Sequence, residues 1–160
     1  MIPVMETHNS SSSLKREHSR HGQRIYAFQV LYSLKFNPAE SQVQTTFEHF
    51  LDENQGRESQ YALELVQGVL QRLEELDAVI GSYSRNWRVE RIALVELTIM
   101  RLALFEMLYR PDIPVKVAIN EGIELAKTFG DEGSSNFVNG VLDAAAKDVR
   151  NGKLRTDKRP

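Results

Sequence analysis

The sequence predicts an all-α protein. Apolar residues recur three and four positions apart along most of the 160 residues, and no segment alternates between polar and apolar residues over the length of a strand. Proline and glycine interrupt this pattern and divide it into segments of helical length. Hydrophobic residues make up 41% of the chain and charged residues 26%, which is typical of a globular protein with a real core. One helical domain is therefore expected.

The first helix is expected over residues 14–34, after a Ser- and Asn-rich segment, residues 1–13, that we expect to be disordered. One row of this helix, at a spacing of four residues, begins basic and ends aromatic: Arg16, Arg20, Arg24, Phe28 and Tyr32. We expect the aromatic half to pack on a core and the basic half to project beyond it. Gly22 weakens the projecting half by about 1 kcal/mol relative to alanine.

Two more helices are expected before the middle of the chain. Asn37-Pro38 marks a turn and a helix start. The inner face of the helix that follows is apolar: Val43, Phe47, Phe50 and Leu51. The next helix begins near Glu58 and ends within residues 81–84, and the sequence leaves open whether residues 71–76 contain a kink.

A long apolar helix is expected over residues 89–108. It carries two apolar stripes, formed by Ile92, Val95, Ile99 and Leu102 and by Leu94, Leu97, Leu104 and Leu108. Two stripes indicate burial on more than one side, so this is predicted to be the central helix. Its acids, Glu90, Glu96 and Glu106, lie off both stripes, and we expect them to face a basic partner.

Proline, glycine and serine define the last two helices. Pro111 and Pro114 precede an amphipathic helix over residues 115–129, and Gly130 ends it. Ser134 or Ser135 is expected to cap the final helix. The pair Asn139-Gly140 within this helix is interpreted as a point of close approach by another helix.

Composition excludes several classes of function. The absence of cysteine excludes disulfides and thiolate chemistry, and no apolar run reaches the ~20 residues of a membrane helix. The first residues do not resemble a secretory signal, so a cytoplasmic protein is expected. His18 and His21 lie three positions apart, but no carboxylate or cysteine completes a metal site. Since no nucleophile, base and anion hole occur together, we expect neither an enzyme nor a cofactor.

The net charge of −2 hides a strong segregation of charge. Two segments, residues 14–24 and 147–160, are basic, and the remainder is acidic. Their basic residues are Lys15, Arg16, Arg20 and Arg24, and Lys147, Arg150, Lys153, Arg155, Lys158 and Arg159. This predicts two kinds of partner, an anion for the ends and a basic molecule for the body. Whether the basic tail, residues 149–160, contacts a partner or is merely solvated stays open.

Several segments resemble the NusB family. The resemblance rests on Val117-Ala118-Ile119-Asn120-Glu121, on Phe129-Gly130 and on Phe137-Val138-Asn139-Gly140-Val141-Leu142-Asp143. It extends to Phe28-Gln29-Val30-Leu31-Tyr32-Ser33 and to Arg101-Leu102-Ala103-Leu104-Phe105-Glu106, in order, and covers residues 14–148. The first helix departs from the dense arginine run of the family, because His21, Gly22 and Gln23 lie between Arg20 and Arg24. Gly133 stands where relatives often carry an acid.

The resemblance implies a compact domain of about seven helices in two packed sub-bundles. It also implies binding to boxA-type single-stranded RNA of nascent ribosomal RNA transcripts. The implied protein partner is the small-ribosomal-subunit protein that acts as NusE, and the pair would assemble with RNA polymerase and other Nus factors into an antitermination complex. The alternative is a helical protein–protein interaction module or homodimer without RNA function.

The candidate RNA-binding residues come from both ends of the resemblance. For phosphate contacts they are Lys15, Arg16, Arg20 and Arg24. For base contacts they are Gln29, Tyr32 and Phe137, because single-stranded RNA is recognised by stacking and by its base edges. Tyr32 and Phe137 are equally compatible with ordinary core positions. The candidates for the protein interface are Glu90, Glu96 and Glu106.

Overall fold

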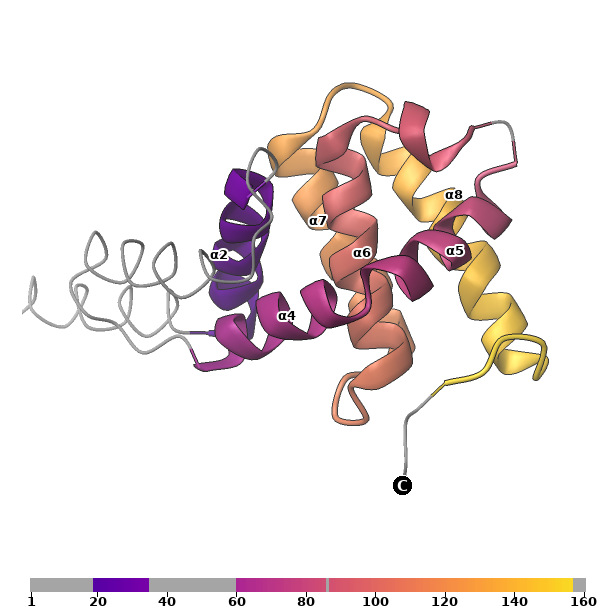
Figure 1. Cartoon of the computed structure of the whole chain (residues 1–160), viewed down its shortest axis with the longest axis horizontal. Helices are drawn as coiled ribbons and strands as arrows, with labels where there is room; N and C mark the ends of the chain where they lie inside the picture. The colour runs from indigo at the N-terminus through magenta and orange to yellow at the C-terminus, as the bar shows by residue number, and fades with distance from the viewer. Residues whose placement is uncertain (1–18, 35–59, 86, 157–160) are drawn as a thin grey trace, which may run out of the picture. The chain divides into compact units, whose positions relative to one another are not determined.

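The computed structural model describes residues 19–34, 60–85 and 87–156, and the regular structure in these ranges is helical (Figure 1). The prediction of an all-α protein is therefore confirmed. The chain divides into two compact units, Met1–Glu64 and Leu65–Pro160. The helix expected after Asn37-Pro38 lies outside the described residues.

Helix α2, Arg20–Ser33, belongs to the first unit. Ser19 is its N-cap: its backbone is extended, and its Oγ accepts a hydrogen bond from the backbone N–H of Gly22 at 3.3 Å. Helix α2 therefore begins at Arg20. Residues 14–18, which are expected from the sequence to begin this helix, lie outside the described residues. The predicted row of side chains starts with Arg20 on this helix, and Lys15 and Arg16 lie outside the described residues.

The helix expected to begin near Glu58 and to end within residues 81–84 is two helices, α4, Gln60–Gln71, and α5, Leu73–Tyr83. The break falls at Arg72, whose backbone (φ −123°, ψ 24°) is not helical. The Arg72 guanidinium lies 4.5 Å from the ring centroid of Tyr109 and 5.7 Å from that of Phe105. The kink that the sequence left open is thus a real break, and the arginine at it covers two aromatic rings.

The central helix is α6, Leu94–Tyr109, and it packs against α5, α7 and α8 (Figure 1). It starts five residues later than expected from the sequence. Val89–Arg91 form a short 3₁₀ helix, η2, and both Ile92 and Ala93 have extended ψ angles. Ile92 is buried, which is why it extends the apolar period beyond the helix itself. Every residue from Leu97 to Leu108 except Arg101 is buried.

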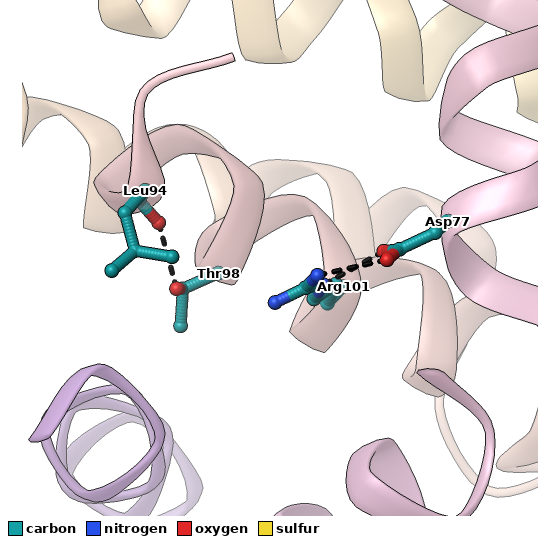
Figure 2. Close-up of polar contacts among 4 residues, drawn as sticks. All are labelled: Asp77, Leu94, Thr98 and Arg101. Carbon is teal, nitrogen blue, oxygen red and sulfur yellow. Dashed lines mark hydrogen bonds and ion pairs between the residues drawn. The ribbon is translucent and has the colours of Figure 1, made fainter. Parts of the chain in front are cut away.

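Polar side chains on α6 are held by specific partners. Arg101 donates two hydrogen bonds to Asp77 of α5, from Nε at 2.7 Å and from Nη2 at 2.8 Å (Figure 2). The Thr98 hydroxyl donates to the Leu94 carbonyl within α6 at 2.7 Å (Figure 2). The Tyr109 hydroxyl donates to Glu75 at 2.6 Å. The bonds of Arg101 and Tyr109 fix α6 against α5 at two points along its length.

Helices α7, Val115–Phe129, and α8, Ser134–Arg150, complete the second unit. Their close approach occurs at Gly122, where a Cβ atom would lie 2.9 Å from Leu142 Cδ1 and 3.3 Å from Ala103 Cβ. The interpretation of Asn139-Gly140 as the point of close approach is wrong. Both residues are exposed, and a Cβ at Gly140 would meet nothing within 4 Å.

The chain turns back after α8. Gly152 has a φ of 75°, a left-handed conformation that glycine adopts without strain. The turn brings the N–H groups of Lys153 and Leu154 to the Asp148 carbonyl, at 2.8 and 3.0 Å. The first part of the predicted basic tail, residues 149–154, is therefore folded onto the end of the helix.

We predict opposite effects from adding one methyl group at two helical glycines. A Cβ at Gly68 of α4 would overlap the ring of Phe105, so Gly68→Ala should destabilise the protein by about 1–3 kcal/mol through overpacking. Gly140→Ala meets open space and should stabilise it by about 0.5–1 kcal/mol. Urea unfolding followed by circular dichroism measures both; a neutral Gly68→Ala would contradict the packing described.

A second prediction concerns pH. The Tyr83 hydroxyl donates to Asp148 Oδ2 at 2.7 Å. Burial, followed by the hydrogen bond and the charge of Asp148, raises the pKa of Tyr83 from 10.0 to about 12. Between pH 10 and about 12 the folded protein keeps the Tyr83 proton, which the unfolded chain loses. The free energy of unfolding therefore falls as pH rises through this range.

Tyr83→Phe removes this titration. Below pH 10 we expect the variant to be less stable than the wild type by about 1 kcal/mol, because one hydrogen bond is lost. Above pH 10 this difference should shrink. Urea unfolding of both proteins between pH 8 and 11 measures it, and a difference that stays constant over this range would count against the bond.

Candidate nucleic-acid interface

Arg20 lies exposed at the start of α2 with its guanidinium stacked on an aromatic ring. Its Cζ is 3.8 Å from the ring centroid of Tyr61, which is buried on α4. A guanidinium stacked in this way is held by its face, while the N–H groups at its edge keep the geometry that suits a phosphate. The Gln23 side chain beside it accepts the N–H of Ala62 at 3.3 Å, which ties α2 to the first turn of α4.

Arg24 is not at the surface, contrary to its prediction as a phosphate contact. Only 3% of it is exposed, and its Cζ lies 5.8 Å from the same Tyr61 ring. The reason is its place on the helix, since Arg24 shares a face with the buried Ala27 and Phe28. Arg24 thus lies on the inner face of α2, near the Tyr61 ring.

Gln29 and Tyr32 differ in what they offer a ligand. Gln29 is exposed, and it stands nine residues after Arg20, about half a turn away around the helix. Arg20 and Gln29 therefore face opposite sides of α2. Tyr32 is half-buried, with its ring stacked on Phe28 at 5.8 Å between centroids. This stacking agrees with the core interpretation of Tyr32, and its role in base contact stays a prediction.

Phe137 is half-buried in the second unit, on the first turn of α8. It follows a turn whose geometry depends on Ser134. The Ser134 Oγ accepts the N–H of Asp131 at 2.9 Å and donates to Glu96 Oε1 of α6 at 2.8 Å. Gly130 is needed beside it, because a Cβ there would lie 2.5 Å from Ser134 Cβ. This relay connects the turn at Gly133 to an acid of the central helix.

The three predicted interface acids do not form one surface. Glu90 is exposed on η2, and Glu96 is half-buried and bonded to Ser134. Glu106 is only 1% exposed, so the expectation that it faces a partner is wrong. Its position off the two apolar stripes does not bring it to the surface, because α6 is buried on nearly all sides.

Sequence reasoning missed the loop between α5 and η2. Trp87 is 53% exposed there, and it borders an open hollow of about 620 Å³. The walls of the hollow include Gly81, Ser84, Arg85, Arg88 and Glu90. The signal in the sequence was a tryptophan between two arginines, next to a glycine and serine helix end.

Within the described ranges, no three His, Cys, Asp or Glu side chains lie close enough to hold a metal ion. None of the helices in these ranges has the length and apolarity to cross a membrane.

The comparisons with known proteins agree with the fold and with the quoted segments. Residues 21–147 match the model of the NusB family. The chain belongs to the NusB family. The match runs from the start of α2 into the last turn of α8, so it leaves out the basic segment before His21 and the tail after Lys147.

Curated NusB relatives are similar over nearly their whole length. The transcription antitermination protein NusB of Oleidesulfovibrio alaskensis is 51% identical over 142 residues, which covers 85% of this chain and 92% of that protein. The protein of the same name from Nitratidesulfovibrio vulgaris strain Hildenborough is 48% identical over 143 residues, with 86% and 94% covered.

Solved NusB structures share the fold. NusB from T. maritima is 34% identical with a TM-score of 0.72, covering 81% of this chain and 92% of that one. A second match is the crystal structure of the antitermination factors NusB and NusE in complex with dsRNA, at 27% identity and a TM-score of 0.69. It covers 78% of this chain and 93% of that one.

The relay through Ser134 can be tested directly. Ser134→Ala removes the donor to Glu96 and the acceptor for the Asp131 N–H, and we expect a loss of about 1–2 kcal/mol in unfolding free energy. The Asp131 amide should also exchange faster with deuterium. Ser135→Ala, one position along, is the matched control and should leave both measurements unchanged. Equal effects of the two variants would refute the relay.

Proposed function

We propose that this protein is an RNA-binding transcription antitermination factor. The observation that carries the proposal is its 51% identity to a transcription antitermination protein NusB, over 92% of that protein's length. A second observation agrees with it: a NusB chain of the same fold has been solved with NusE and RNA. The chemistry proposed is assembly and not catalysis, and the proposed location is the cytoplasm.

The proposed ligand is boxA-type single-stranded RNA of nascent ribosomal RNA transcripts. Arg20 is the phosphate contact that the geometry favours, since it is exposed and its guanidinium is oriented by Tyr61. Lys15 and Arg16, which precede the described part of the first unit, are proposed to add charge. Gln29, Tyr32 and Phe137 remain the proposed base contacts, whereas Arg24 is buried near the Tyr61 ring.

The proposed protein partner is the small-ribosomal-subunit protein acting as NusE. Glu96 is the acid proposed to face this basic protein, because it keeps some exposed surface on the second unit, whereas Glu90 stands in the chain between Arg88 and Arg91, which would repel that protein. Two partners that each contact the RNA hold it more tightly than either alone, since the second contact forms at a high effective concentration. The resulting complex is proposed to join RNA polymerase and other Nus factors.

The proposal predicts that Arg20→Ala weakens binding of boxA RNA by about tenfold, because one charge-assisted phosphate contact is lost. The slope of log K against log salt should become shallower by about 0.7, the value for one phosphate on a single strand. Fluorescence anisotropy of labelled RNA at several salt concentrations, with and without the NusE-type partner, measures both quantities.

Lys116→Ala is the charge-matched control for this experiment. Lys116 is exposed near the start of α7, so its loss should change neither the affinity nor the slope by as much. Equal affinity for boxA and scrambled RNA in the presence of the partner would reject boxA recognition. An absence of RNA binding under all conditions would favour the alternative, a helical interaction module or homodimer.

A further inference from the structure

The loop from Ser84 to Arg91 presents a large aromatic side chain to solvent. Trp87 is 53% exposed, and among the other large hydrophobic residues of the described ranges only Val117 is more than about a third exposed, at 37%. The exposed half of this indole adds nothing to the apolar area buried on folding. The open hollow beside Trp87 leaves the exposed part of the ring accessible to a ligand.

Two hydrogen bonds fix the backbone at Trp87. The backbone N–H of Trp87 donates to the Ser84 carbonyl at 3.0 Å, and the Ser84 hydroxyl donates to the backbone carbonyl of Trp87 at 3.0 Å. Ser84 is itself buried and caps α5, whose last residue, Tyr83, is bonded to Asp148 of α8. The backbone that carries Trp87 is thus connected to the end of α5 and, through Tyr83, to α8.

Cationic side chains lie in the same hollow as Trp87. Arg85 and Arg88 line the hollow, and Arg91 follows on η2; all three are exposed. Within the described part of the chain, none of the three forms an ion pair or a side-chain hydrogen bond, although Glu90 lines the same hollow. The local charge is therefore positive, on a chain whose net charge is −2.

We propose that the hollow at Trp87 is a second RNA contact, at which one unpaired base stacks on the indole. Arg85 and Arg88 hold the phosphates on either side of that base. An aromatic face beside guanidinium groups is how proteins bind single-stranded nucleic acid. The lining of the hollow includes two arginines and one acid, Glu90, so its charge favours RNA over a basic partner.

The inference rests on the proposed RNA function and extends it to a site outside the first unit. Trp87, Arg85 and Arg88 would then bind RNA in addition to the basic row of α2. The second unit would thus contribute to RNA affinity by its own contacts.

Trp87 is the only tryptophan of the chain, so its fluorescence reports on this hollow alone. The full-length protein is titrated with unlabelled boxA RNA while indole emission is followed with excitation at 295 nm. The affinity is measured in parallel by anisotropy of labelled RNA. We expect the emission to be quenched with the same dissociation constant as that from anisotropy.

Two sets of variants complete the test. Trp87→Ala should weaken RNA binding by about tenfold or more, and Trp87→Phe, which keeps a stacking face, by clearly less. The double variant Arg85→Ala with Arg88→Ala should make the salt slope shallower by about 1.4, or about 0.7 per phosphate. The double variant Lys116→Ala with Lys127→Ala removes the same charge elsewhere on the unit and should change the slope less.

The outcomes separate this inference from the proposed function. RNA binding by anisotropy without quenching, and with normal affinity in Trp87→Ala, would overturn the second contact and leave the proposed function standing. If the Trp87, Arg85 and Arg88 variants lost binding to the NusE-type protein but kept their RNA affinity, the hollow would be a protein contact, and the second RNA contact would be overturned. No RNA binding by the wild type would reject both.

Discussion

The burial of α6 is the constraint on which the second unit depends. Nearly every residue from Leu97 to Leu108 is inside, so this helix has almost no face on which to leave a polar group in water. Its buried Thr98 pairs with the Leu94 carbonyl inside the helix, because an unpaired buried group costs about 1–3 kcal/mol. Its half-buried polar side chains pair with other elements. Arg101 meets Asp77, and Glu96 meets Ser134. These pairs set the positions of α5 and of the turn before α8.

The functional candidates lie where this buried framework ends. Phe137 and the turn at Gly133 follow Ser134, which is fixed by Glu96 of the central helix. Trp87 follows Ser84, which caps a helix fixed to α6 by the Asp77 ion pair. Short loops tied to a rigid core can present side chains with little freedom of their own, which suits recognition of a flexible polymer such as RNA.

Much of the fold could be predicted from the sequence because apolar periodicity identifies long helices well. It failed where a buried side chain lies outside a helix, as Ile92 does, because burial and not helicity produces the pattern. Charge was a second source of error. Arg24 was expected at the surface and Glu106 at an interface because charged residues are seldom buried, yet both are buried. The close approach at Gly122 depends on which faces of α7 and α8 meet, and one sequence does not contain that information.

The stack of Arg20 on Tyr61 has a consequence for how RNA affinity can evolve. A long arginine side chain in solution loses rotational freedom when it grips a phosphate, which costs about 0.5–1.5 kcal/mol of binding free energy. Here the ring restricts the side chain before any ligand arrives, so part of that entropy is lost on folding. Under the proposal that Arg20 contacts a phosphate, Tyr61, a buried residue in the first turn of α4, would tune RNA affinity through Arg20. Sequence changes in the core of the first unit would then alter binding as surely as changes at its surface.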